Sequence, residues 1–328
     1  MITSDNEYIN IEHPVFRNGT LNVSINSIQT HLGNKKVMYD LLSKDPRSFD
    51  FLPFTITFNV VDLGYKSMIK DLFTRSPKWI LKPALGLQGK DIIISSSYSR
   101  IINYIISKPM YSEWVLSRYI DNPFLLKLKG RCNSGAIFND TVGRKVHIRI
   151  YILITKINNV KHIYLYDNNL LFSAVCEYNK KSRYSNLTNL HLASIYYNKK
   201  LKIDGSLAYQ DLSFPLRETV NEIYGNRFYN KVVFPQLKNM LTVILENSVI
   251  DYEKVNNQTI GSFHRLAIDI MPDSNFHLHL LEINAHPGMN APEYHWNGLD
   301  RYFKSLVNKT ADQLYDGKKN VKGFILIK

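Results

Sequence analysis

The sequence predicts a mixed α/β fold (α+β) built from antiparallel strands and amphipathic helices. Residues 143–154 contain the clearest strand, because basic and aliphatic side chains alternate there with a period of two. Residues 268–271 and 280–284 alternate in the same way on the two sides of a turn, which indicates an antiparallel hairpin. Residues 232–248 instead carry apolar side chains at helical spacing. Strand and helix periodicities therefore occur together in one chain.

The remaining elements follow from local pattern and from the positions of proline and glycine. In the first part of the chain we expect helices over 35–44, 65–78 and 98–107, and strands over 55–58, 79–83, 91–95 and 114–120. In the second part we expect a turn at Asn158 and Asn159, a returning strand over 161–167, a helix over 211–225 and a final helix over 297–315. The strands over 79–83 and 91–95 form a hairpin around a glycine-containing loop.

The composition describes an ordinary globular chain with a basic surplus. Its 328 residues are 45% hydrophobic and 21% charged, and the formal net charge is +13. Such a charge favours an acidic partner: nucleic acid, an anionic membrane surface or an acidic protein tail. The lysines and arginines are spread along the chain, which argues against a dedicated nucleic-acid arm.

Cysteine usage and the N-terminus indicate the compartment. Cys132 and Cys176 are too few for a disulfide framework and suit a reducing environment. Residues 1–7 lack the basic and apolar regions of a signal peptide, and no apolar run reaches transmembrane length. We therefore expect a cytoplasmic protein without a membrane partner.

Lys82 is the first candidate for phosphate binding. It lies at the end of a predicted strand, just before a loop that contains Gly86 and Gly89. A fixed ammonium beside exposed backbone N–H groups can hold a phosphate, and glycine lets the backbone approach closely. No Gly-Lys-Ser/Thr opens a helix here, so the loop is not a Walker A motif. The alternative is an ordinary surface lysine on a β-hairpin.

Three basic side chains follow on one face of the long strand. Lys145, His147 and Arg149 alternate with aliphatic residues, so they point to the same side. Burying an unpaired cation is costly, and a repeated basic face therefore indicates an enclosed anion site. A solvated sheet face or a nucleic-acid surface remains the alternative.

The hairpin near the C-terminal end supplies oxygen atoms. Asp269, Glu282 and Asn284 fall on strand positions, and oxygen ligands of this kind suit Mg²⁺, which usually shares them with nucleotide phosphates. The alternative is a half-buried hairpin whose polar residues face solvent.

In this order the three features resemble the ATP-grasp arrangement, and the chain resembles the tubulin tyrosine ligase family, including its ligase-like glutamylases and glycylases. The resemblance runs from about residue 25 to 310. It rests on the motifs at residues 79–83, 117–123, 143–149, 163–166 and 186–189, and on 268–269 together with 281–287. The resemblance implies an ATP-grasp fold with the nucleotide between two mixed or antiparallel sheets. It divides the chain into a reduced N-terminal region (1–33), a central subdomain with the phosphate-cradling hairpin (34–120) and a C-terminal subdomain with the magnesium site (121–328).

The resemblance also implies roles for individual residues. The implied ATP-binding residues are Lys35, Lys82, Gln88, Gly89, Ser117, Arg118, Tyr119, Ile120, Lys145, His147, Asn186, Leu187, Thr188 and Asn189. Ser117–Ile120 would be the adenine hinge. Lys145 and Arg149 would be catalytic, holding the phosphates and an acyl-phosphate intermediate. Asp269, Glu282 and Asn284 would bind Mg²⁺.

The implied reaction is ATP-dependent amide formation. A carboxylate of an acidic acceptor, most naturally a tubulin C-terminal tail, would be phosphorylated and then attacked by the amine of free glutamate, tyrosine or glycine. Such a protein would work in the cytoplasm, in association with microtubules.

Three positions depart from the family pattern. His147 stands where the family has aspartate, Asn186 where it has histidine, and Phe172 where it has an arginine that helps to hold substrate carboxylates. The departures keep two alternatives open: a nucleotide- or tubulin-binding pseudoenzyme, and an ATP-grasp ligase for another acidic protein. A nucleic-acid-binding role is a more distant alternative, which steeply salt-dependent binding would reveal.

Overall fold

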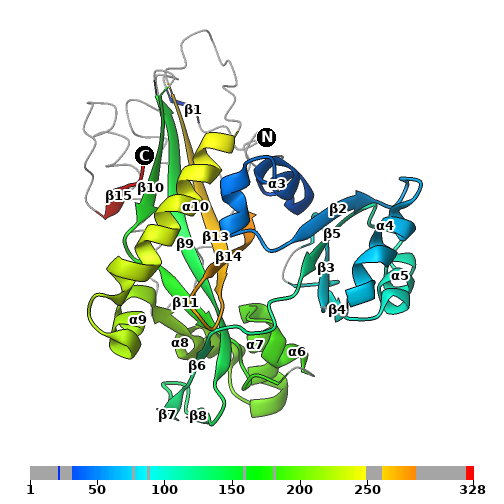
Figure 1. Cartoon of the computed structure of the whole chain (residues 1–328). Helices are drawn as coiled ribbons and strands as arrows, with labels where there is room; N and C mark the ends of the chain where they lie inside the picture. Colours follow the sequence, from blue (N-terminus) through cyan, green and yellow to red (C-terminus); the bar gives the residue numbers. More distant parts are fainter. Residues whose placement is uncertain are drawn as a thin grey trace.

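The computed structural model describes residues 21–22, 32–75, 78–86, 89–157, 160–179, 182–248, 261–285 and 323–328. Within these residues the chain builds two main sheets, and the smaller one stands beside the larger (Figure 1). A third, two-stranded sheet is the hairpin of β7 (Lys129–Arg131) and β8 (Ile137–Asn139). None of the described helices has the length and apolar character needed to cross a membrane.

The smaller sheet has four antiparallel strands with their own core. Their order is β2 (Thr55–Asn59), β5 (Glu113–Arg118), β3 (Trp79–Pro83) and β4 (Ile93–Ser95). The helices α4 (Tyr65–Leu72) and α5 (Tyr98–Ile106) pack beside it (Figure 1). Trp79 and Trp114 are buried against Ile69 of α4 and Ile101 of α5. The apolar faces of these two short helices thus become part of a compact core.

The larger sheet is curled and is organised around β9 (Arg144–Ile157). Antiparallel partners of β9 are β6 (Leu125–Leu126), β10 (Val160–Tyr166), β11 (Leu170–Ser173) and β13 (Gly261–Pro272). The outer strands are β1 (Leu21–Asn22), β12 (Ser213–Pro215), β14 (Leu278–Asn284) and β15 (Phe324–Leu326). All of these pairs are antiparallel except that of β1 with β13. The alternation in β9 therefore divides the sheet into an apolar face and a polar face.

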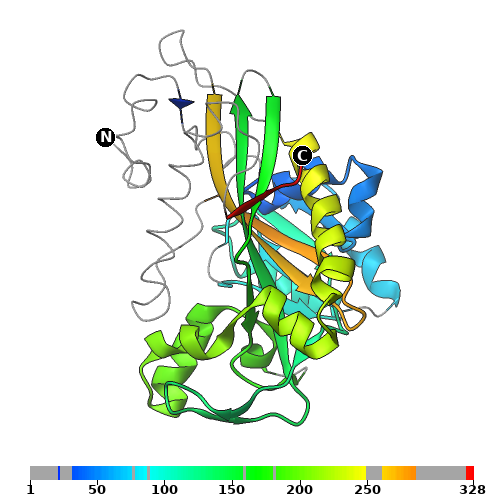
Figure 2. The same cartoon turned by 90° about the vertical axis from the view of Figure 1, so that its left-hand side faces the viewer.

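Helices cover the apolar face and close one end of the larger sheet. The helix α10 (Phe234–Asn247) lies along the sheet, and Leu237, Leu241 and Ile244 are fully buried in the same core as Ile148 and Ile150 of β9 (Figures 1 and 2). The helix α3 (Lys35–Leu42) contacts both α10 and β14. The other helices are α6 (Arg183–Asn186), α7 (Leu190–Tyr196), α8 (Ala208–Leu212) and α9 (Leu216–Tyr224).

A glycine turn fixes the start of β9. Gly143 has φ of 102°, and a Cβ there would lie 3.2 Å from Leu125 Cβ and 3.3 Å from the Leu126 carbonyl oxygen. The Glu177 carboxylate accepts hydrogen bonds from the N–H groups of Thr141 and Val142 at 2.6 and 2.8 Å. In this turn Gly143 has a positive φ, and the preceding N–H groups are bound by the Glu177 carboxylate. Only glycine fits position 143 without strain.

The structure confirms the mixed α/β fold with two sheets and most of the predicted elements. It differs at two helices: α4 ends at Leu72 and passes into a 3₁₀ turn over Phe73–Arg75, and the helix expected over 211–225 begins only at Leu216. Pro215 explains the second difference, because proline lacks the N–H that a helix interior needs and is tolerated at a helix start. The expected turn at residues 158–159 and the helix over 297–315 lie outside the described residues.

Candidate functional site

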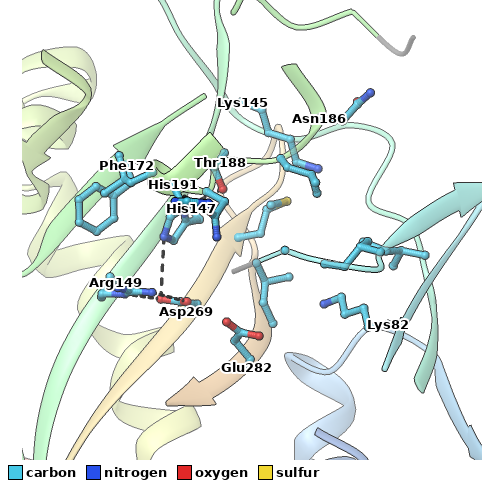
Figure 3. Close-up of a pocket in the computed structure, with 18 of the residues that line it drawn as sticks. Lys82, Lys145, His147, Arg149, Phe172, Asn186, Thr188, His191, Asp269 and Glu282 are labelled. Atoms are coloured by element: carbon cyan, nitrogen blue, oxygen red, sulfur yellow. Dashed lines mark hydrogen bonds and ion pairs between the residues drawn. The ribbon is translucent and has the colours of Figure 1, made fainter. Parts of the chain in front are cut away.

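A cavity of about 870 Å³ is lined by residues of both main sheets. Its lining includes Lys82 of β3, the polar face of β9, and side chains of β13 and β14 (Figure 3). The full set of lining residues is Tyr39, Pro53, Ile80, Lys82, Gly89, Ile92, Ser117, Arg118, Tyr119, Ile120, Lys145, His147, Arg149, Phe172, Asn186, Leu187, Thr188, Asn189, Leu190, His191, Ser194, Gly205, Ser206, Tyr209, Asp269, Met271, Leu281, Glu282 and Asn284. Its size suits a cofactor or substrate site.

Lys82 lies on the small-sheet side of the cavity, opposite the β9 residues (Figure 3). The alternation of β3 buries Leu81 in the core of the smaller sheet and turns the next residue to the cavity. Burial lowers the pKa of Lys82 to about 8; Glu282 and Asp269 raise it, and Lys35 lowers it further. An anionic ligand would stabilise the charged form of this ammonium.

Lys145 is buried in the cavity wall with a tyrosine as its partner. Its Nζ donates a hydrogen bond to the Tyr119 hydroxyl at 3.0 Å and lies 4.3 Å from the centre of the same ring. Tyr119 in turn donates to Asn186 Oδ1 at 3.0 Å. Burial, assisted by the charge of Lys82, lowers the pKa of Lys145 to about 7. Among the described residues no carboxylate forms an ion pair with Lys145, and the charge of Asp121 offsets the lowering of its pKa only in part, so the site favours an incoming anion.

His147 contacts a hydroxyl and an aromatic ring, and its Nε2 lies 3.9 Å from Asp269 Oδ1 (Figure 3). Its Nδ1 lies 2.7 Å from Thr188 Oγ1, and its ring centre is 5.1 Å from that of Phe172, its cross-strand neighbour on β11. Burial lowers the pKa of His147 to about 4, although Asp269 raises it. The imidazole is therefore uncharged at neutral pH.

Arg149 and Asp269 form a paired, buried unit. The Arg149 Nε and Nη2 donate to the two Asp269 carboxylate oxygens, each at 2.7 Å. Burial opposes both charges, yet each partner holds the other ionised: the pKa of Arg149 is raised, and the guanidinium lowers the pKa of Asp269 to about 2. Arg149 is thus less available to a phosphate than Lys82 or Lys145.

The polar residues of the hairpin meet on one face. Asp269 and Glu282 are directly opposite each other on β13 and β14. Asn284 Nδ2 donates to Asp269 Oδ2 at 3.2 Å, and Lys35 Nζ lies 3.1 Å from Glu282 Oε2. A hard oxygen set of this kind fits Mg²⁺, since two neighbouring carboxylates leave room for water and phosphate ligands.

The set is nevertheless small. In the parts of the chain that the structure describes, no group of three or more histidine, cysteine, aspartate or glutamate side chains is placed to hold a metal ion. Asp269, Glu282 and Asn284 together provide two carboxylates and one amide oxygen. The magnesium assignment therefore stays a prediction, and it requires a nucleotide to complete the coordination.

The structure places most of the predicted site residues around the cavity. Gln88 lies outside the described residues. Lys35 does not line the cavity: its Nζ donates to the Gly86 carbonyl at 2.8 Å and pairs with Glu282. Asn189 has a helix-capping role, because its side chain accepts hydrogen bonds from the N–H groups of His191 and Leu192 at the start of α7.

Sequence reasoning missed one wall of the cavity. His191, Ser194, Ser206 and Tyr209 line it from α7, a 3₁₀ turn and α8. These short helices have no long apolar period to predict them. The available signal was Asn189, an N-cap residue followed by Leu190 and Leu192.

Comparisons with known proteins give consistent results. The family model described as the tubulin-tyrosine ligase family matches residues 22–316. A Tetrahymena thermophila protein named "Probable alpha-tubulin polyglutamylase" is 28% identical over 284 residues, which cover 81% of this chain and 60% of that protein. Tubulin glycylase 3D from the same organism is 25% identical over 243 residues, covering 73% of this chain and 21% of the relative. A tubulin monoglutamylase of Homo sapiens is 23% identical over 223 residues, covering 65% of this chain and 17% of the relative. The chain thus spans less than two thirds of the length of these relatives.

Proposed function

The chain belongs to the tubulin-tyrosine ligase family, and from this premise we propose that it is an ATP-dependent ligase that joins the amine of an amino acid to a protein carboxylate. One observation supports the proposal most. The cavity between the two sheets brings two buried lysines, Lys82 and Lys145, to the same space as the carboxylates of Asp269 and Glu282. Buried cations near an acidic pair suit a nucleotide triphosphate with its metal ion.

The proposed reaction has two steps. In the first, an oxygen of the acceptor carboxylate attacks the γ-phosphorus of ATP, the bond to ADP breaks, and an acyl-phosphate forms. In the second, the amine nitrogen attacks the acyl carbon, the bond to phosphate breaks, and the nitrogen loses a proton to give an amide. Lys82 and Lys145 would stabilise negative charge on the phosphates in both steps.

The polar hairpin has a separate role in this proposal. Asp269, Glu282 and Asn284 would hold Mg²⁺, which neutralises charge on the transferring phosphoryl group when bound. Arg149 fixes the orientation of the Asp269 carboxylate through its two hydrogen bonds. We assign to Arg149 this positioning role, with direct contact to phosphate as a secondary one.

The end of β5 is the proposed adenine site. Ser117, Arg118, Tyr119 and Ile120 line the cavity where the chain leaves the smaller sheet. Backbone groups there would bind the edge of the base, while apolar neighbours such as Ile80 and Met271 cover its faces. In this arrangement residues 34–120 and 121–328 would supply opposite sides of the nucleotide site.

The proposed acceptor is an acidic tubulin tail in the cytoplasm; the names of the relatives support tubulin as the acceptor. A net charge of +13 favours association with such a tail. Magnesium-dependent ATP binding by this chain, its acceptor and the amino acid that it adds are all parts of the proposal.

A second candidate is a binding protein without turnover. Both candidate metal carboxylates already have cationic partners, since Asp269 is paired with Arg149 and Glu282 with Lys35. If Arg149 and Lys35 neutralise these carboxylates too fully for Mg²⁺ to bind, the chain would bind a nucleotide or tubulin without catalysis.

Mass spectrometry distinguishes the two candidates. The protein is incubated with ATP, Mg²⁺, a mixture of amino acids and either tubulin or an unrelated acidic peptide. A ligase adds whole amino-acid residues to the acceptor, and ADP appears in equal amount. Nucleotide binding without any mass increase on any acceptor contradicts the ligase proposal and favours the binding protein. Addition to the peptide but not to tubulin would indicate a different acidic acceptor.

A further inference from the structure

A chain of hydrogen bonds joins Lys145 to Asn186 through the hydroxyl of Tyr119. Lys145 Nζ donates to the Tyr119 oxygen at 3.0 Å, and the same hydroxyl donates to Asn186 Oδ1 at 3.0 Å. Figure 3 shows Lys145 and Asn186 at the same end of the cavity. The three side chains are buried, and they come from β9, from the residue after β5 and from the last residue of α6. The chain therefore connects segments that are far apart in the sequence.

The direction of these hydrogen bonds is fixed. A lysine ammonium only donates, so the Tyr119 oxygen accepts from Lys145 and its single proton goes to another partner. Asn186 Nδ2 donates to the carbonyl oxygens of Ser182 and Asn179 at 2.7 and 3.4 Å. Because carbonyl oxygens only accept, the amide is oriented with Oδ1 toward Tyr119, where it accepts that proton.

Both polar atoms of the Asn186 side chain are thus used within the protein. The resemblance implies an ATP-binding role for Asn186, and the residue does line the cavity. Bringing its amide to a nucleotide would, however, break buried hydrogen bonds to the protein, which is costly. The geometry suits Asn186 better to holding Tyr119 than to binding a ligand.

Tyr119 is fixed at its backbone as well as at its hydroxyl. Its N–H donates to the Lys78 carbonyl at 2.8 Å, which ties it to the edge of the smaller sheet. Burial raises the pKa of Tyr119, with further contributions from Tyr178 and Asp121, so the hydroxyl stays protonated and remains a donor to Asn186. The Tyr178 hydroxyl donates to the Asp121 carbonyl oxygen at 3.3 Å. The place of the Tyr119 oxygen, and of the ammonium bound to it, is therefore set from two sides.

We propose that Asn186 is a positioning residue that acts through Tyr119 to hold the Lys145 ammonium for the phosphates, and that it does not bind the nucleotide itself. The inference rests on the ligase function proposed above and specifies how one of its phosphate-binding groups is held. Tyr119 takes one of the three ammonium hydrogens, and the others remain for phosphate oxygens. A lysine that is already held also loses less conformational freedom when the phosphate arrives.

The first test compares adenosine with a non-hydrolysable ATP analogue in Mg²⁺ by calorimetry. Asn186→Leu should weaken binding of the analogue by about threefold or more and leave that of adenosine within about twofold, because only the phosphates use the positioned lysine. Tyr119→Phe removes just the hydroxyl and should have the same effect. Equal losses for the two ligands in both variants contradict the proposal.

A double variant separates positioning from general damage. Asn186→Leu combined with Lys145→Met should bind the analogue no more weakly than Lys145→Met alone, because the asparagine acts through the lysine. Asn247→Leu is the matched control: Asn247 Nδ2 also donates to a carbonyl four residues earlier, but the residue does not line the cavity. Additive losses in the double variant, or a loss specific to the analogue in the control, overturn the proposal.

NMR tests the positioning without any nucleotide. Lys145 Nζ lies over the Tyr119 ring, 4.3 Å from its centre, so the ring current should displace the signal of the neighbouring ε-CH₂ group upfield. The protein is prepared with ¹³C in its lysine side chains, and Lys145→Met identifies the signal. Asn186→Leu and Tyr119→Phe should each move it toward the position of an unfolded chain, whereas Asn247→Leu should not. An unmoved signal in both variants refutes the positioning role.

The two kinds of measurement distinguish this inference from the function on which it rests. If neither adenosine nor the ATP analogue binds to the original protein, the nucleotide site proposed above is wrong. The NMR signal then still decides whether Asn186 holds Lys145. If both ligands bind and the signal and the affinities are unchanged in Asn186→Leu and Tyr119→Phe, the nucleotide site stands and the positioning role is wrong.

Discussion

Lys145 shows at the scale of one residue how the fold prepares a site for an anion. Its ammonium is buried and hydrogen-bonded to an uncharged hydroxyl, so its charge is destabilised in the free protein. Phosphate binding would remove that penalty. The same burial makes the lysine a measurable cost to stability.

The prediction for Lys145 concerns pH. The folded state has a pKa of about 7 against the ordinary value of 10.5, so between these values the unfolded chain binds more protons and the contribution of Lys145 to stability rises with pH. Lys145→Met removes this dependence. Without nucleotide, the variant should be more stable than the original protein at pH 7, and this advantage should shrink by about 2 kcal/mol between pH 7 and pH 9. Urea unfolding of both proteins at each pH measures the difference; a constant difference would show that the lysine is not buried as a destabilised cation.

Glu282 provides a second prediction at this scale. Glu282→Gln keeps the shape of the side chain but removes a candidate metal oxygen charge. We expect the affinity for an ATP analogue in Mg²⁺ to fall about tenfold or more, while the affinity measured in a chelator stays nearly unchanged. Calorimetry measures both. Glu113→Gln is the matched control, because Glu113 is a half-buried strand residue outside the cavity. Equal losses with and without Mg²⁺ would contradict the metal assignment.

At the scale of the elements, the strands were the most predictable part of the structure. The strict alternation of β9 predicts both its pairing and the common face of Lys145, His147 and Arg149, because a strand residue can point only to one side or the other. The pairing of Arg149 with Asp269 was not predictable, since it depends on the register between β9 and β13. The wall formed by α7 and α8 was not predicted either. Packing rather than local sequence pattern stabilises helices this short, so the sequence alone does not reveal them.

The turn before β9 gives a prediction at this scale. Gly143→Ala should destabilise the protein by about 1–3 kcal/mol, because alanine is strained at φ of 102° and its Cβ meets Leu125 and Leu126. Gly225→Ala is the control: its φ is 100°, but a Cβ there meets nothing within 4 Å. Gly225→Ala should therefore lose only the stability that backbone strain at positive φ costs, without the added cost of a steric clash. Chemical unfolding of both variants measures the difference, and equal losses would mean that the packing around Gly143 relaxes without cost.

At the scale of the whole molecule, the described residues form two hydrophobic cores, and residues of both main sheets line the cavity. Val115 of β5 belongs to the larger core, while its strand neighbours Trp114 and Leu116 belong to the smaller one. The smaller core has fewer buried residues, and we expect its strands to open more easily than α10. A ligand that contacts both sides would connect the two cores.

Hydrogen exchange tests this expectation for the whole molecule. Addition of an ATP analogue with Mg²⁺ should slow amide exchange in β3 and β5 by at least about tenfold, and more than in α10, which is already buried in the larger core. The measurement is exchange detected by mass spectrometry, with and without the ligand. Slowing confined to the larger sheet would place the nucleotide on one side only. No change anywhere would argue against a nucleotide site in the cavity.

Because β9 carries the core on one face and Lys145, His147 and Arg149 on the other, its length is constrained as well as its composition. An insertion or deletion of one residue near its start would exchange the two faces for the positions that follow, sending His147 and Arg149 into the core and Ile148 and Ile150 into the cavity. Insertions and deletions of two residues keep the alternation. Among natural or engineered variants of this chain, length changes within β9 should therefore occur in even steps, whereas the exposed β7–β8 hairpin can accept either parity.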